Sequence, residues 1–90
     1  MLTPREQAAA AYNVALASGR RRVLGVDDMV IVTEERLSNA RRAKRAIVAA
    51  RGSERHFPRE PDDARLEQML SCVSELVETL EGDHTRWAAS

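Results

Sequence analysis

The spacing of apolar residues is most regular between Pro61 and Gly82 of this 90-residue chain. Successive residues of an α-helix lie about 100° apart, and on that spacing the apolar side chains of this segment fall within an arc of about 120°. They are Leu66, Met69, Leu70, Val73, Leu76, Val77 and Leu80. Pro61 and the two aspartates after it suit a helix N-terminus, and Gly82 suits a C-terminal stop. The pattern predicts a core-facing helix over residues 62–81.

Another helix is indicated near the N-terminus by Thr3, Pro4 and Glu6, which match a capping box with proline at the first helical position. Apolar residues then recur at helical spacing until Gly19, which is placed to end the helix. They are Ala8, Ala11, Tyr12, Ala15 and Leu16. We therefore predict a helix over residues 4–18. It carries few large apolar groups, so we expect it to pack as a third member against two stronger helices.

The segment from Val23 to Val32 has two interpretations. In the first, Asp27 or Asp28 caps a long helix over residues 28–51 that Gly52 ends. One face of this helix would carry Met29, Thr33, Leu37, Ala40, Ala43 and Ile47. In the second, residues 30–32 form a β-strand that pairs with residues 23–26, because β-branched residues favour extended structure. A two-stranded hairpin is marginal by itself, so we favour the long helix.

The polar segment 53–60 contains Pro58 and reads as the loop that joins the second and third helices, with Phe57 expected to turn inward. Residues 1–3 are a short lead-in, and residues 83–90 are expected to form a short tail. The fold class predicted for residues 1–90 is a single all-α domain. It is a small three-helix bundle in which the second and third helices are antiparallel and the first packs across them.

The composition excludes several classes of site. The chain has one cysteine and two histidines, which gives no disulfide framework and no zinc-binding spacing. No catalytic or cofactor motif is present, so we expect neither an enzyme nor a bound cofactor or metal. No signal-peptide pattern or long apolar run appears, which favours a soluble, cytoplasmic protein. Thirteen arginines against one lysine, with many alanines, are typical of a GC-rich genome, bacterial or phage.

Charge is segregated along the chain although the net charge is zero. Residues 36–59 contain eight basic residues and one acidic residue, whereas residues 60–83 contain eight acidic residues and one basic residue. On the second helix Arg41, Arg42 and Arg45 lie opposite the apolar face, with Lys44 and Arg51 at its margin. The acidic face of the third helix carries Glu67, Glu75 and Glu78. Because both faces point away from a shared core, we expect that they do not neutralise each other within one molecule.

Our leading hypothesis is a non-enzymatic adaptor, inhibitor or accessory protein that binds a protein partner, or a second copy of itself, through these charged faces. The alternative is a small nucleic-acid-binding regulator that uses the same arginines, although the acidic helix weakens it. The candidate contact residues are Arg20, Arg21, Arg22, Arg41, Arg42, Lys44, Arg45, Arg51 and Trp87. Trp87 either closes the end of the bundle or anchors a partner.

Overall fold

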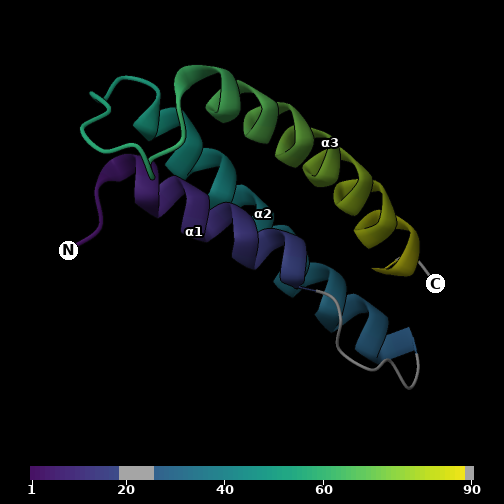
Figure 1. Cartoon of the computed structure of the whole chain (residues 1–90). Coiled ribbons are helices and arrows are strands. Elements are labelled where there is room, and N and C mark those ends of the chain that lie inside the picture. Colours follow the sequence, from purple (N-terminus) through teal and green to yellow (C-terminus); the bar gives the residue numbers. More distant parts are fainter. Residues whose placement is uncertain (19–25, 89–90) are drawn as a thin grey trace.

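The computed structural model describes residues 1–18 and 26–88. These residues include three helices, α1 (Pro4–Ala17), α2 (Val26–Ala50) and α3 (Asp63–Ala88). Helix α2 is the central element, because α1 and α3 both pack along it and touch each other at few points (Figure 1). Helix α2 runs antiparallel to both neighbours. The predicted all-α three-helix bundle is therefore confirmed, and α2 is the element on which the other two helices rest.

Helix α1 begins with the predicted capping box. The Thr3 hydroxyl accepts a hydrogen bond from the backbone N–H of Glu6 at 3.2 Å, and the Glu6 carboxylate accepts one from the N–H of Thr3. Ser18 follows the last helical residue, and its hydroxyl donates to the carbonyl of Ala15 at 2.8 Å. Gly19, the predicted stop, lies outside the described residues. Helix α1 thus has the predicted start and ends within one residue of the expected position.

Residues 26–32 belong to helix α2, so the strand interpretation of residues 30–32 is wrong. Val32 and Thr33 are both buried, and Thr33 lies on the same side of the helix as Leu37. The Thr33 hydroxyl also donates to the carbonyl of Met29 at 2.6 Å, which satisfies it within the helix. Burial of this face outweighs the preference of β-branched residues for extended structure, since helix propensities differ by only a few tenths of a kcal/mol per residue, at most about 0.7.

Helix α3 differs from its prediction at both ends. It begins at Asp63, and the side chain of Asp62 accepts a hydrogen bond from the N–H of Arg65, so Asp62 caps the helix and Pro61 precedes it. The predicted stop at Gly82 is wrong, because the helix continues to Ala88 and includes most of the expected tail. Glycine costs only about 1 kcal/mol inside a helix. A hydrogen bond between His84 and Glu34 of α2, at 3.1 Å, holds the extension against its neighbour.

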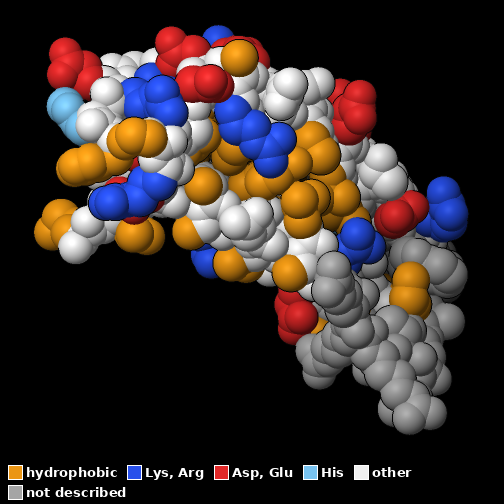
Figure 2. Space-filling model, viewed as in Figure 1, with side chains coloured by type: hydrophobic (Ala, Val, Ile, Leu, Met, Phe, Trp, Pro, Cys, Tyr) orange, Lys and Arg blue, Asp and Glu red, His pale blue; other side chains and the backbone are white. Residues whose placement is uncertain are grey.

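The core lies where α2 faces its two neighbours. Its buried residues are Ala8, Tyr12, Ala15, Leu37, Ala40, Ala43, Ile47, Ala50, Leu66, Met69, Val73, Val77 and Leu80. Alanines dominate where α1 meets α2, and such small side chains let two helices approach closely. Apolar side chains also gather in the seam between α1 and α3 (Figure 2), where a hollow of about 240 Å³ is lined partly by Tyr12 and Met69.

The loop between α2 and α3 is fastened to the start of α1 by a buried arginine. The side chain of Arg5 is almost completely buried, and its guanidinium donates to the carbonyls of Ser53 and Pro61 and to the carboxylate of Asp63, at 2.7, 3.0 and 2.6 Å. This one side chain therefore joins α1, the loop and the first turn of α3. We call Arg5 and Glu60, with the groups that they bind, the turn cluster.

Glu60 is the second buried charge of the turn cluster. Its carboxylate accepts hydrogen bonds from the backbone N–H groups of His56 and Phe57 at 2.6 and 2.7 Å. A hydrogen bond with the Thr3 side chain and these two N–H groups lower the pKa of Glu60 to about 2. The expected inward turn of Phe57 is wrong, because its side chain is 43% exposed and lies beneath the guanidinium of Arg59. Glu60 instead fills the interior of the loop.

Candidate protein interface

The outer face of α2 is the side turned away from both α1 and α3, and it is the far side of the molecule in the view of Figure 1. Helical spacing places this face opposite the buried residues Ala40 and Ile47. Its residues are exposed, and they are Ile31, Glu34, Glu35, Ser38, Arg42, Arg45 and Ala49. The face combines acidic residues near its start, basic residues further along and an isoleucine that is 48% exposed.

Two of the predicted contact arginines are paired with acidic residues of α3. Arg41 contacts Glu81 at 3.3 Å, and Arg51 contacts Glu67 at 2.7 Å. The expectation that the two charged faces do not neutralise each other is therefore wrong for these residues. Their side chains sit at the flank of α2 and are long enough to cross to α3. All four are about half exposed, so each pair stabilises the fold by less than about 1 kcal/mol.

Three cations of α2 and two carboxylates of α3 have no such partner among the described residues. Arg42, Lys44 and Arg45 are exposed and make no hydrogen bond or ion pair with any residue that the structure describes. On α3, Glu75 and Glu78 are likewise exposed and unpaired within residues 1–18 and 26–88. The structure thus divides the predicted contact residues into a paired group at the flank and an unpaired group that points to solvent.

Four of the predicted contact residues cannot be assigned to either group. Arg20, Arg21 and Arg22 lie outside the described residues. Trp87 belongs to the last turn of α3, although its side chain is not described. Its two predicted roles, closing the bundle and anchoring a partner, both stay predictions.

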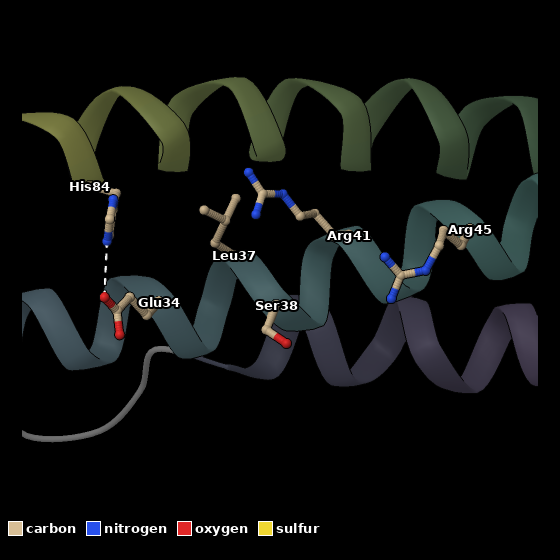
Figure 3. Close-up of a pocket in the computed structure, with 6 residues that line it drawn as sticks. All are labelled: Glu34, Leu37, Ser38, Arg41, Arg45 and His84. Atoms are coloured by element: carbon tan, nitrogen blue, oxygen red, sulfur yellow. Dashed lines mark hydrogen bonds and ion pairs between the residues drawn. The ribbon is translucent and has the colours of Figure 1, made fainter.

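A hollow of about 500 Å³ lies beside the outer face, between α2 and α3 (Figure 3). It is lined by Glu34, Leu37, Ser38, Arg41, Arg45 and His84. The Arg41 side chain reaches toward α3, whereas Ser38 and Arg45 point away from it (Figure 3). Glu34 is held at one end by His84, and the unpaired Arg45 lies at the other end. A hollow with a carboxylate at one end and a guanidinium at the other offers room for charged side chains of both signs.

Sequence reasoning overlooked Glu34, Ser38 and His84 as members of this region. Ser38 could have been found, because helical spacing already places it on the same face as Arg45. The contact between Glu34 and His84 had no local signal, since 50 positions separate the two residues. Long-range pairs of this kind depend on how far α3 extends along α2.

The described residues offer little support for other kinds of site. No group of three His, Cys, Asp or Glu side chains among them is placed to hold a metal ion. Cys72 is exposed, and its hydrogen bond with Tyr12, together with burial of the ring, raises the pKa of the Tyr12 hydroxyl. Across the described helices, none is both long and apolar enough to cross a membrane. The outer face of α2 is therefore the main candidate site.

The comparisons with known proteins give no family assignment for this arrangement of helices. No family model, no curated protein and no solved structure matches the chain.

Proposed function

We propose that this chain is a non-enzymatic interaction module that binds a protein partner through the outer face of α2. The observation that carries the proposal is the pair of exposed cations on this face, Arg42 and Arg45, that lack an ionic partner among the described residues. Arg41 and Arg51, which lie beside them, do have partners on α3. Acidic side chains on a neighbouring protein would form ion pairs with the unpaired cations, as acidic residues of α3 do with Arg41 and Arg51.

The composition of the outer face favours a protein over a nucleic acid. Glu34 and Glu35 lie on the same face about two turns before Arg42 and would repel a phosphate backbone that ran along the helix. Exposed Ile31 adds an apolar contact, and arginine is enriched at protein interfaces. A face with both charge signs and an apolar residue has the composition of a protein interface and lacks the uniform positive charge that nucleic acids select.

The proposal can be tested with a photo-crosslinking amino acid in place of Ser38, at the centre of the outer face, in cells that produce the full chain. The same amino acid in place of Ala10, an exposed residue of α1, is the control. We expect a protein adduct from position 38 and none from position 10. The adduct should disappear when Arg42→Ala and Arg45→Ala are added. Arg65→Glu on α3 changes the net charge by the same amount and should leave the adduct intact.

Two results would contradict the proposal. One is an equal yield of protein adducts from positions 10 and 38, because the outer face would then have no preference for a partner. The other is binding of a fluorescent DNA duplex, measured by anisotropy at low and moderate salt, that is strong in the wild-type chain and lost in the Arg42→Ala, Arg45→Ala variant. That result would favour the nucleic-acid regulator, since phosphate binding weakens steeply with salt.

A further inference from the structure

The outer face of α2 contains a stripe of residues spaced alternately four and three positions apart. The stripe consists of Ile31, Glu35, Ser38, Arg42, Arg45 and Ala49. This alternation is the heptad pattern by which one helix meets another along its length, and all six residues are exposed. The stripe is about 27 Å long, at 1.5 Å per residue. Helix α2 therefore presents solvent with a seam of the form used for helix pairing.

The stripe is also symmetric about its centre at the level of residue 40. Reversing its direction exchanges Ile31 with Ala49, Glu35 with Arg45, and Ser38 with Arg42. Each acidic position thus exchanges with a basic one, and each apolar position exchanges with another apolar one. A surface with this property is complementary to itself when a two-fold axis passes through its centre.

We propose that two copies of this chain associate through an antiparallel pair of α2 helices. This proposal rests on the proposed function, and the protein partner that it names is a second copy of the chain. Glu35 of each copy faces Arg45 of the other, so the ion pair forms twice. Ser38 faces Arg42, and Ile31 packs on Ala49. The residues of the stripe alternate between the two core positions of a heptad, a and d. Each layer joins a residue at position a of one copy to a residue at position d of the other, as in antiparallel helix pairs.

The alternative parallel pairing places each residue of the stripe against its own copy. Arg42 would then face Arg42, Arg45 would face Arg45, and Glu35 would face Glu35. Like charges held in contact across an interface cost several kcal/mol. The distribution of charge along α2 therefore selects the antiparallel orientation.

The surroundings of the stripe leave room for a second helix. The buried residues of α2 face α1 and α3, so neither helix covers the outer face. Ser38 is small and lies at the centre, where it allows the two backbones to approach. The hollow beside Ser38 would receive the long side chain of Arg45 from the second copy, and Glu34 stands at the end of this hollow as a further carboxylate (Figure 3).

The mainly polar character of the stripe predicts a weak and salt-sensitive dimer. A single pair of helices buries less than the roughly 1,600 Å² of a standard interface. We therefore expect a micromolar dissociation constant. Salt should weaken the dimer, because exposed charges are screened over about 10 Å at 0.1 M ionic strength and over about 3 Å at 1 M.

A charge-swap series tests the pairing by sedimentation velocity of the full chain. We expect Glu35→Arg and Arg45→Glu, each alone, to raise the dimer dissociation constant by about a hundredfold or more, because each creates two repulsive contacts. The double variant E35R/R45E restores opposite charges in both layers and should return the constant to within about tenfold of wild type. Circular dichroism confirms that each variant remains helical. A wild-type chain that stays monomeric at high micromolar concentration, or a double variant as weak as the singles, overturns the proposal.

A cysteine experiment tests the register without changing the Glu35–Arg45 layer. In chains that carry Cys72→Ser, S38C is mixed with R42C and oxidised. The mixture should form crosslinked dimers several times faster than either variant alone, because Ser38 lies opposite Arg42 only in the proposed register. Equal rates overturn the register. A crosslinked adduct of position 38 with a different protein, in the photo-crosslinking experiment above, would support the interaction module and overturn the homodimer.

Discussion

The turn cluster and the outer face of α2 both concentrate charged residues, yet they use charge differently. In the turn cluster, Arg5 and Glu60 are buried; Arg5 makes three hydrogen bonds to backbone carbonyls of the same chain and Glu60 accepts two from backbone N–H groups. On the outer face, Arg42 and Arg45 are exposed and have no partner among the described residues. Charge in the first region holds the fold together, whereas charge in the second is available to another molecule. The comparison predicts that mutations in the two regions affect different properties.

The largest expected effect is loss of stability when Arg5 is replaced. Arg5→Ala removes the donor for two loop carbonyls and for Asp63, and we expect it to lower the free energy of unfolding by about 3 kcal/mol. Arg5→Lys keeps the charge but lacks the planar fork, so its loss should be smaller. Arg42→Ala and Arg45→Ala are the matched controls and should each change stability by less than about 0.5 kcal/mol. Urea denaturation measures all four, and equal losses in the two regions would contradict the comparison.

An intermediate effect is expected from acid, through Glu60. Its pKa is lowered to about 2 from an ordinary value of 4.5, so the charged form is the one that the folded state stabilises. The stabilisation is complete above about pH 5 and is lost as the pH falls toward 2. Glu60→Gln should lower stability at neutral pH and flatten the dependence between those values.

The acid response has a second contributor that needs its own control. The pKa of Glu6 is also lowered, mainly by its hydrogen bond with Arg59, so part of the acid response should persist in the Glu60→Gln variant. Glu6→Gln measures that part. The measurement is the melting temperature of the wild-type chain and of both variants between pH 7 and pH 2. A pH profile of Glu60→Gln that equals the wild-type profile would show that the buried carboxylate does not stabilise the loop.

The smallest effect concerns the end of the molecule opposite the turn cluster, where α3 passes through Gly82. A Cβ atom at Gly82 would meet no atom within 4 Å, so Gly82→Ala should fit and raise the free energy of unfolding by about 1 kcal/mol. Gly52→Ala is the control, because its Cβ also meets open space but the residue lies in a turn. The control measures the part that comes from restricting the unfolded chain. The melting temperatures of the two variants are compared. If Gly82→Ala raises the melting temperature no more than Gly52→Ala does, the helical position of residue 82 adds no stability.

The successes and failures of the sequence predictions follow a physical division. The capping box at Thr3 and the core face of α2 were predicted correctly, because both depend on residues within one or two turns of each other. The stop at Gly82 failed because glycine opposes a helix only weakly, and contacts between α3 and α2 outweigh it. The inward turn of Phe57 failed because Glu60 already fills the loop.

The sequence by itself determined three helices, the apolar faces on which they meet and the separation of basic from acidic segments, since all of these follow from helical periodicity. Only the tertiary structure decided which charges are paired. Arg41 pairs with Glu81 and Arg51 pairs with Glu67, while Arg45 forms no ion pair with any described residue. The reason is that these contacts depend on the axial alignment of α2 and α3. That alignment is set by how the core side chains of both helices interlock, which no local pattern in the sequence encodes.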